Sequence, residues 1–254
     1  MKFSIITVTK NSALTIQRTV KSVTSQIYNN IEHVIKDVGS TDGTIELAKL
    51  LNPNVVVISK PDIGIYDAMN QGFLASTGDI VAFLNSDDYY MDSSVLSDIA
   101  LAFKLNDCDY VYGDITVVST TGEIVRIWQT GRIDGEGLVG RQIPHPGLFI
   151  RRCVFNKLIL PFDPSYRISG DLKQQLIIIN QLKCKGEYLN RSLVVMQNGG
   201  ESTSSLISYY LGWKESVRAH NEVLGSGGLW FVIKKVLSKF RGLRVQAQIR
   251  HFGR

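Results

Sequence analysis

The apolar run at residues 80–84 constrains the fold of this chain more than any other segment. It is followed at once by Asn85-Ser86-Asp87-Asp88. Such a run is typical of a strand buried on both faces, as in a parallel sheet, and ligands of open α/β sheets bind just beyond the carboxyl ends of their strands. Two carboxylates at that point suit a divalent cation that also contacts a diphosphate. Taken alone, the motif is equally compatible with a polar turn in which Asp88 caps the next helix.

Strand and helix patterns alternate through the first part of the chain. Runs rich in β-forming residues cover 3–9, 31–36, 55–59 and 80–84, and three helical patterns separate them. We expect Ser12 to cap the first helix and Gly78 to end the third in a left-handed conformation. Four strands separated by three helices predict parallel βαβ units with right-handed crossovers.

Beyond residue 94 the pattern predicts mixed structure. A helix is expected at 95–105, a hairpin around Thr120-Thr121-Gly122 and another helix at 171–182. The fold class is therefore α/β, with a mainly parallel nucleotide-binding sheet flanked by helices and an appended helical segment at the C-terminus.

The cysteines and the hydropathy pattern bound the cellular setting. Three cysteines, widely spaced and odd in number, argue against a disulfide framework or a zinc cluster. No apolar stretch has the length of a membrane-spanning helix, and residues 1–6 lack a signal-peptide layout. We expect a cytoplasmic protein.

The positive charge is concentrated at the C-terminus. Residues 229–254 contain seven Lys and Arg and no acidic residue, so the net charge of +5 becomes −2 for the rest of the chain. This distribution argues against a general nucleic-acid-binding surface.

The same segment has an amphipathic pattern, typical of a helix that lies at a membrane surface. On a helical wheel, the apolar side holds Leu229, Ile233, Val236, Leu237, Phe240 and Leu243, with Trp230 at the boundary, and the opposite side holds Lys234, Lys235, Ser238 and Arg241. Anionic lipids attract such a segment by about 1 kcal/mol per basic residue. We expect residues 229–254 to bind an anionic membrane surface; the alternative is a helix packed on the domain with a solvated basic face.

Three polar clusters fall at the ends of the predicted parallel strands. They are residues 7–11, residues 37–42 and residues 85–88. Because these strand ends meet at one edge of a sheet, we expect the clusters to converge. Asp37 is placed to accept a hydrogen bond from a uracil imide or a ribose hydroxyl, and Gly39 would let the backbone approach a flat base. For Asp42-Gly43, simple turn chemistry is the favoured interpretation.

These motifs carry a family resemblance. The first ninety or so residues contain, in the family's order, the segments 4–11, 37–44, 60–72 and 78–88, and a weaker likeness continues at 145–147 and 163–171. The chain resembles a family 2 glycosyltransferase of the GT-A fold, of the small bacterial type that builds surface polysaccharide.

The resemblance implies a set of functional residues. Asp87 and Asp88 would hold Mn²⁺ or Mg²⁺, and Asp171 would be the base of an inverting transfer, although Asp is also a common helix cap. We expect His145 and Arg167 on the acceptor side; for His145, contact with the diphosphate and a purely structural role are the alternatives. The residues expected to bind the nucleotide sugar are Thr7, Thr9, Asn11, Asp37, Gly39, Ser40, Lys60, Asp67, Asn70 and Asp87.

The resemblance also implies an organisation and a substrate class. Residues 1–200 would be the catalytic domain, divided into a nucleotide-sugar-binding half (1–92) and an acceptor-side half (93–200), and residues 201–254 would be the basic helical segment. The donor would be a UDP-hexose or UDP-N-acetylhexosamine. The acceptor would be a saccharide carried by a lipid, at the inner face of the cell membrane.

Three positions depart from the family pattern. Val38 replaces a usual Gly, Met69 replaces a frequent Arg, and Asn85 stands where many relatives have Asp. A nucleotidyltransferase is an alternative, but no Gly-rich basic loop follows the first strand. A non-catalytic nucleotide-binding protein is another, and the intact Asp87, Asp88 and Asp171 argue against it.

Overall fold

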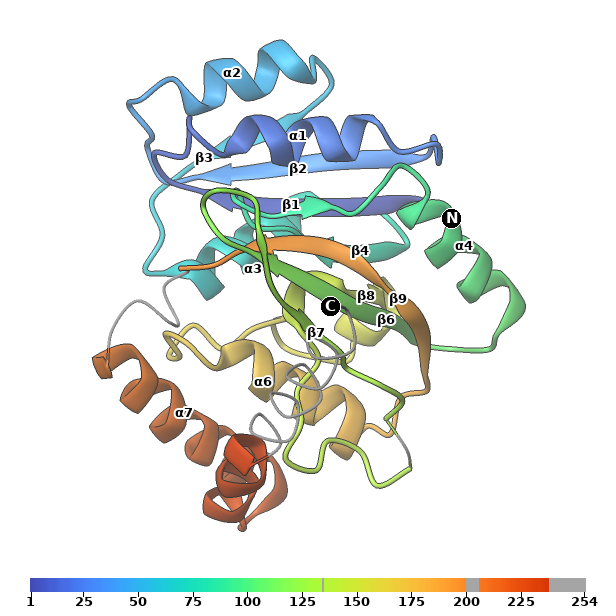
Figure 1. Ribbon diagram of the computed structural model, residues 1–254, viewed down its shortest axis with the longest axis vertical. Helices are drawn as coiled ribbons and strands as arrows, with labels where there is room; N and C mark the ends of the chain where they lie inside the picture. Colours follow the sequence, from blue (N-terminus) through green and yellow to red (C-terminus); the bar gives the residue numbers. More distant parts are fainter. Residues whose placement is uncertain (134, 200–205, 238–254) are drawn as a thin grey trace, which may run out of the picture.

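A mixed sheet forms the centre of the molecule. The computed structural model describes residues 1–133, 135–199 and 206–237. The strands are β1 (Phe3–Thr9), β2 (Ile31–Asp37), β3 (Val56–Ser59), β4 (Ile80–Phe83), β5 (Tyr89–Tyr90), β6 (Tyr110–Val118), β7 (Ile124–Trp128), β8 (Leu148–Arg151) and β9 (Gly186–Gln197). They are ordered β3-β2-β1-β4-β8-β6-β9-β5, with β7 paired to β6 (Figure 1).

Helices cover both faces of this sheet. They are α1 (Ile16–Thr24), α2 (Thr44–Leu51), α3 (Ile65–Ala75), α4 (Val95–Leu105), the 3₁₀ turn η1 (His145–Gly147), α5 (Arg152–Phe155), α6 (Gly170–Gln175), the π-helical η2 (Leu176–Gln181) and α7 (Leu206–Leu224). Residues 228–237 are also helical. Hydrophobic clusters place α3, α5, α6, η2 and α7 on one face and α1, α2 and α4 on the other.

The predicted parallel half is confirmed. β1 pairs in parallel with β2 and β4, and β2 pairs in parallel with β3. Successive side chains of a strand point to opposite faces, and Ile5 and Ile6 accordingly pack into different clusters, each almost fully buried. Burial on both faces explains why β4 is a continuous apolar run.

The predicted cap at Ser12 is wrong. α1 begins at Ile16, and its cap position is Thr15, whose side chain makes no capping hydrogen bond. The Ser12 hydroxyl instead lies 2.9 Å from the hydroxyl of Ser86. A bond between the loop after β1 and the loop after β4 holds two of the polar clusters together.

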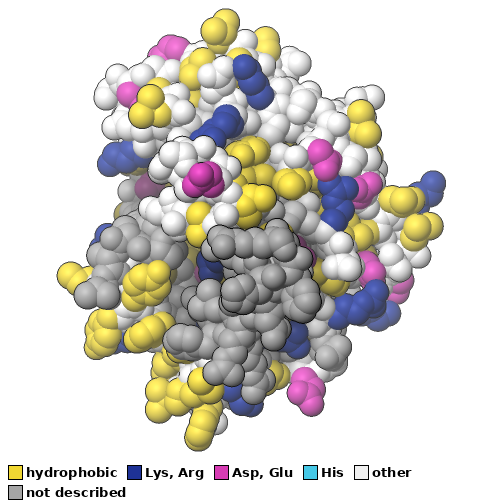
Figure 2. All heavy atoms as spheres, in the orientation of Figure 1, with side chains coloured by type: hydrophobic (Ala, Val, Ile, Leu, Met, Phe, Trp, Pro, Cys, Tyr) yellow, Lys and Arg dark blue, Asp and Glu magenta, His cyan; other side chains and the backbone are white. Residues whose placement is uncertain are grey.

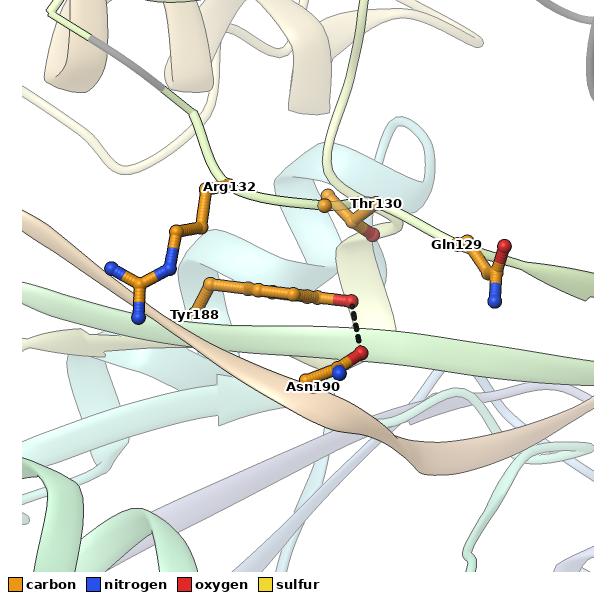
Figure 3. Close-up of a pocket in the computed structure, with 6 residues that line it drawn as sticks. Gln129, Thr130, Arg132, Tyr188 and Asn190 are labelled. Atoms are coloured by element: carbon orange, nitrogen blue, oxygen red, sulfur yellow. Dashed lines mark hydrogen bonds between the residues drawn. The ribbon is translucent and has the colours of Figure 1, made fainter.

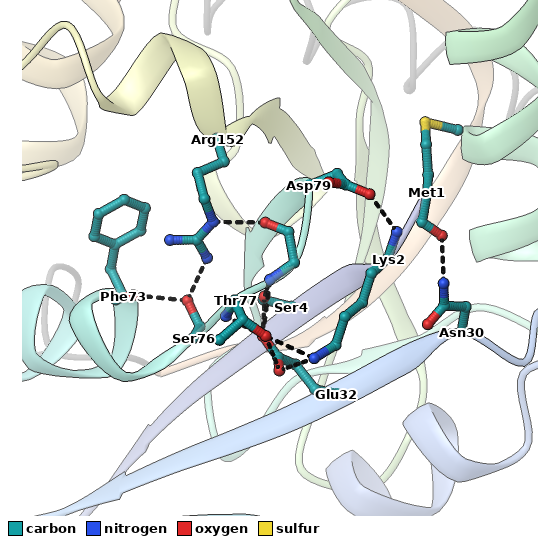
Figure 4. A network of polar contacts seen from close by, with 11 residues as sticks. Met1, Lys2, Ser4, Asn30, Glu32, Phe73, Ser76, Thr77, Asp79 and Arg152 are labelled. Carbon is teal, nitrogen blue, oxygen red and sulfur yellow. Dashed lines mark hydrogen bonds and ion pairs between the residues drawn. The ribbon is translucent and has the colours of Figure 1, made fainter.

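The expected left-handed cap at Gly78 is also wrong. Gly78 is instead required for close approach to β1: its N–H donates to the Ser4 hydroxyl at 2.7 Å, and an added Cβ would lie 2.5 Å from that oxygen and 2.6 Å from the Ser4 nitrogen. Glu32 completes this network by accepting from Lys2, Ser4 and Thr77 (Figure 4). Burial disfavours the Glu32 carboxylate, but these hydrogen bonds outweigh it and lower its pKa to about 2.

The second half of the sheet is mixed, as expected. β8 runs antiparallel between β4 and β6, while β6 runs parallel to β9. The predicted hairpin is formed by β6 and β7, and the predicted helix at 171–182 is observed as α6 followed by η2. Since β6 has the same direction as β4, its carboxyl end points to the edge that carries Asp87.

The C-terminal helices pack on the domain. Ala219 of α7 and Phe231 and Val232 of the following helix belong to the same buried cluster as α3 and α6. The buried side of 228–237 therefore differs from the predicted apolar side, because Leu229, Ile233 and Leu237 are exposed. Positions 238–254, including Ser238, Phe240, Arg241 and Leu243, lie outside the described residues. No helix in the described ranges is long and apolar enough to span a membrane.

Candidate active site

The loops after β1 and β2 form one hydrogen-bonded unit. The backbone N–H of Asn11 donates to the Ser40 hydroxyl at 2.7 Å, and the Asn11 side-chain oxygen accepts from the N–H of Thr41 at 2.9 Å. Asn11 adopts a positive φ of 49°, a conformation that Asn tolerates better than most residues. The first two polar clusters therefore converge as predicted.

The Asp37 carboxylate accepts hydrogen bonds from the loop that follows β2. Its Oδ2 accepts from the N–H groups of Gly39 and Ser40 at 2.8 and 2.9 Å, and its Oδ1 accepts from the Ser40 hydroxyl at 2.5 Å. Gly39 has a φ of +88° and open space where a Cβ would stand. The loop is thus fixed in shape and leaves room for a flat group to approach its backbone.

The loop after β4 is held by α1 and by its own side chains. Asp88 is fully buried, and the Asn85 amide donates to its Oδ2 at 2.9 Å. The Thr19 hydroxyl of α1 donates to the Asp88 carbonyl at 2.8 Å. Asn85, one of the departures from the family pattern, therefore supports Asp88 where a carboxylate would repel it. Asp87 is partly exposed at the surface of this loop.

The electrostatics of the two carboxylates fit a bound cation. Burial raises the pKa of Asp87, and burial together with the negative charge of Asp87 raises the pKa of Asp88 well above its usual value. Asp88 Oδ1 is buried without a hydrogen-bond partner. In the parts of the chain that the structure describes, no three His, Cys, Asp or Glu side chains form a metal-binding group. A cation here would need additional ligands from a substrate or from water.

Asp171 lies in the first turn of α6. Its Oδ1 accepts from the N–H of Leu172 at 2.8 Å, and its Oδ2 accepts from the Gln142 amide at 2.7 Å. The Tyr66 hydroxyl of α3 lies 3.4 Å from Oδ1 and donates to the Ile168 carbonyl at 2.7 Å. Burial and then the Asp171 charge raise the pKa of Tyr66, so this hydroxyl stays protonated.

His145 packs against two aromatic side chains. Its ring packs 5.3 Å from the ring of Phe83, the last residue of β4, and 5.4 Å from that of Phe162. Burial lowers the pKa of His145, and the nearby charge of Asp171 acts in the opposite direction. Neither ring nitrogen has a hydrogen-bond partner. The charge of Asp171 thus acts on a ring that packs against the last residue of β4.

Two of the predicted donor-binding residues, Thr7 and Asn70, have their side chains bonded within the fold. Thr7 is fully buried, and its hydroxyl lies 3.0 Å from the His33 ring nitrogen. The hydroxyl of Thr9, another predicted donor-binding residue, is buried without a hydrogen-bond partner. Asn70 is occupied at both ends by the backbone of Phe162.

Two further predicted donor-binding residues, Asp67 and Lys60, lie around the start of α3, and Arg167 lies near α7. Asp67 accepts from the N–H of Ile63 at 3.0 Å and from Gln71 at 3.1 Å. Lys60 is exposed on the β3–α3 connection. Arg167, predicted on the acceptor side, is exposed, and its N–H donates to Glu215 of α7.

Two supporting residues were missed from the sequence. Lys36 is almost fully buried in β2, and its ammonium group donates to Asp62 at 2.7 Å and to the Asp37 carbonyl at 3.0 Å. Glu215 accepts from three consecutive backbone N–H groups, at residues 167–169, directly before α6. No local pattern reveals either residue, because their partners are distant in sequence or belong to the backbone.

A separate hollow of about 450 Å³ opens beside β7 and β9. Tyr188 and Asn190 line one side and Arg132 the other, and the Tyr188 hydroxyl lies 3.2 Å from the Asn190 side-chain oxygen (Figure 3). The same hydroxyl donates to the buried Asp114 at 2.9 Å. This pocket contains none of the residues predicted from the motifs.

Comparisons with known proteins agree with the motifs. Residues 4–157 match the family described as Glycosyl transferase family 2. The chain is 33% identical over 174 residues to the PGL/p-HBAD biosynthesis glycosyltransferases of Mycobacterium bovis and Mycobacterium tuberculosis, covering 66% of this chain and 66% of each relative. It therefore spans just under two thirds of the length of these relatives.

Solved structures agree with the fold. TarS 1–349 of S. aureus in complex with UDP-GlcNAc has a TM-score of 0.70 at 17% identity, over 93% of this chain and 72% of that one. The mannosyltransferase PcManGT of Pyrobaculum calidifontis, in complex with GDP-Man and Mn²⁺, has a TM-score of 0.66 at 13% identity, over 93% of this chain and 73% of that one.

The sheet and its polar edge define a GT-A fold. With the family match over more than half of its length, the chain belongs to glycosyltransferase family 2.

Proposed function

We propose that this chain is a metal-dependent inverting glycosyltransferase that transfers a hexose or N-acetylhexosamine from a UDP-linked donor to a lipid-linked saccharide. The observation that supports the proposal is the position of His145, which packs on Phe83 at the end of β4 and whose lowered pKa is partly offset by the nearby charge of Asp171.

The donor nucleoside would bind against the loops after β1 and β2. Open backbone at Gly39, the carboxylate of Asp37 and the unpartnered hydroxyl of Thr9 support this placement. The solved neighbours are complexes with UDP-GlcNAc and with GDP-Man, which supports a nucleotide-sugar donor without distinguishing the base.

Asp87 and Asp88 would hold Mn²⁺ or Mg²⁺ beside the donor diphosphate. Mg²⁺ is commonly bound by one or two carboxylates together with substrate phosphates, and the protein supplies two carboxylates here. The cation would neutralise the charge that develops on the departing diphosphate. The Arg18 guanidinium, which lies close enough to Asp87 to lower its pKa against the larger effect of burial, would add a further positive charge.

Asp171 would accept the proton of the acceptor hydroxyl as that oxygen attacks the anomeric carbon. A new carbon–oxygen bond forms on one face of the sugar while the bond to the diphosphate breaks on the other, so the configuration inverts. General-base assistance of this kind typically contributes about 10²–10⁴-fold to the rate. The hydrogen bonds from Leu172 and Gln142 leave further lone pairs of the carboxylate for the acceptor.

The C-terminal helices would face an anionic membrane that carries the acceptor. Leu229, Trp230 and Leu237 are 66%, 68% and 57% exposed, and α7 adds Tyr210 and Trp213. Figure 2 shows hydrophobic side chains at the surface in this region of the molecule. Aromatic and aliphatic side chains beside a basic segment are typical of a surface that binds lipid headgroups and acyl chains.

Turnover of a panel of nucleotide sugars tests the proposal. UDP-glucose, UDP-galactose, UDP-GlcNAc and GDP-mannose would each be supplied with Mn²⁺ or Mg²⁺, and released nucleoside diphosphate would be measured. We expect release from one UDP-sugar, loss of that release in EDTA and recovery on adding the cation. Release of pyrophosphate instead would indicate a nucleotidyltransferase, and full turnover in metal-free buffer would exclude metal dependence.

A further inference from the structure

Gln142 connects the C-terminal helix to Asp171. Its side-chain NH₂ donates to Asp171 Oδ2 at 2.7 Å, and its side-chain oxygen accepts from the Lys235 ammonium group at 2.5 Å. All three side chains are partly buried. Asp171 belongs to α6, Gln142 to the segment before η1, and Lys235 to the helix at 228–237, so the connection joins three parts of the chain that are far apart in sequence.

The chemistry of the neighbours fixes the orientation of the amide. An ammonium group can only donate hydrogen bonds, so the amide oxygen of Gln142 must face Lys235, and a carboxylate can only accept, so the NH₂ must face Asp171. Both hydrogen bonds involve a charged group and are therefore stronger than neutral ones. With the N–H of Leu172 on Oδ1, one donor holds each oxygen of the Asp171 carboxylate.

The backbone around Gln142 is fitted to the same helix. Gly140 has a φ of +63°, and a Cβ at this position would lie 2.3 Å from the Cβ of Lys234. Only a residue without a side chain allows this approach. The helix is in turn anchored in the core by Phe231 and Val232. The contact between Lys235 and Gln142 therefore belongs to a packed interface between the 228–237 helix and the domain.

We propose that Gln142 and Lys235 are positioning residues that set the orientation of the Asp171 carboxylate and make it depend on the seating of the 228–237 helix. This inference rests on the proposed role of Asp171 as the base. Gln142 touches the base directly, and Lys235 acts through Gln142. The donor-binding loops make none of these contacts, so the pair affects the chemical step and not the binding of the nucleotide.

Paired substitutions test the proposal. Gln142→Leu keeps the approximate shape of the side chain and removes both hydrogen bonds. Lys235→Met keeps the aliphatic stem and removes the donor, and Lys235→Arg restores a cationic donor. Lys234→Met is the matched control, because Lys234 is the adjacent residue of the same helix, its side chain is exposed, and methionine retains the Cβ that packs on Gly140.

We expect a split between kcat and KM for the nucleotide sugar identified from the panel. Gln142→Leu should lower kcat about tenfold, as expected for one charge-assisted hydrogen bond, with KM for the donor unchanged. Lys235→Met should lower kcat severalfold, Lys235→Arg should recover most of it, and Lys234→Met should match the wild type. Equal kcat values for Lys235→Met and Lys234→Met would overturn the proposal.

An NMR measurement without substrate tests the connection independently of turnover. The Gln142 side-chain NH₂ signal in the NMR spectrum of the full chain, assigned by its loss in Gln142→Leu, should move in Lys235→Met and in Asp171→Asn but not in Lys234→Met. An unmoved signal would refute the connection. If Asp171→Asn retains full turnover, the proposed base is wrong; if it abolishes turnover while Gln142→Leu and Lys235→Met leave kcat unchanged, only the positioning role fails.

Discussion

At the scale of single residues, the structure assigns Asn70 a structural contact at a position where the motif predicts donor binding. Its amide both donates to and accepts from the backbone of Phe162, at 2.8 and 3.0 Å, and is 2% exposed. Asn70→Leu should therefore destabilise the fold by about 1–3 kcal/mol for each buried group left unpaired, measured by urea unfolding, while nucleotide affinity stays unchanged. Asn54→Leu, at an exposed position, is the control. A fall in affinity with normal stability would instead support donor binding by Asn70.

At the scale of secondary-structure elements, Lys173 of α6 joins Asp163 in the preceding loop to Glu222 of α7, at 2.7 and 2.6 Å. Burial opposes ionisation of both carboxyls, but the hydrogen bonds from Lys173 and its neighbours outweigh it and lower each pKa to about 2. A carboxyl whose pKa is lowered by folding stabilises the protein above its unfolded pKa and ceases to do so as pH falls through the folded pKa. The free energy of unfolding should thus decrease from about pH 4.5 toward pH 2. Lys173→Met should flatten this dependence, whereas Lys185→Met, which removes an exposed pair with Asp107, should leave it unchanged. Identical pH profiles for both variants would contradict this account.

At the scale of the whole molecule, the C-terminal helix is both part of the core and part of the exposed surface. Deleting residues 229–254 would remove Phe231 and Val232 from the buried cluster, so membrane binding is better tested by substitution. Trp230→Ser with Leu237→Ser should weaken binding to anionic vesicles while the melting temperature stays near the wild-type value, because both side chains are exposed. Leu14→Ser, at a position that is 98% exposed on another part of the surface, is the control. Undiminished vesicle binding by the double variant would contradict a membrane role for this face.

The parts of the fold that could be predicted from the sequence are those with local signals. The strand at 3–9 follows from its β-forming residues and the strand at 80–84 from its apolar run. The convergence of the loops that carry Asp37 and Asp87 follows from parallel pairing. The pairing of β6 with β9 could not be predicted, because residues such as Tyr110 and Gly186 meet across a long stretch of chain. The motif likewise could not distinguish a side chain that faces the cleft from one, such as Thr7, that bonds within the core.

The role of Asp171 as the base is tested by comparing kcat with nucleotide affinity in Asp171→Asn. Asparagine preserves the size of the side chain and removes its ability to accept a proton. If Asp171 is the base, kcat should fall by about 10²-fold or more. The dissociation constant of the nucleoside diphosphate and the melting temperature should stay near wild-type values. Asp107→Asn, at a fully exposed side chain, is the control. A loss of about 1 kcal/mol in stability with only a modest change in kcat would show that Asp171 only stabilises the first turn of α6, whose cap position is Ser169, and would contradict its role as the base.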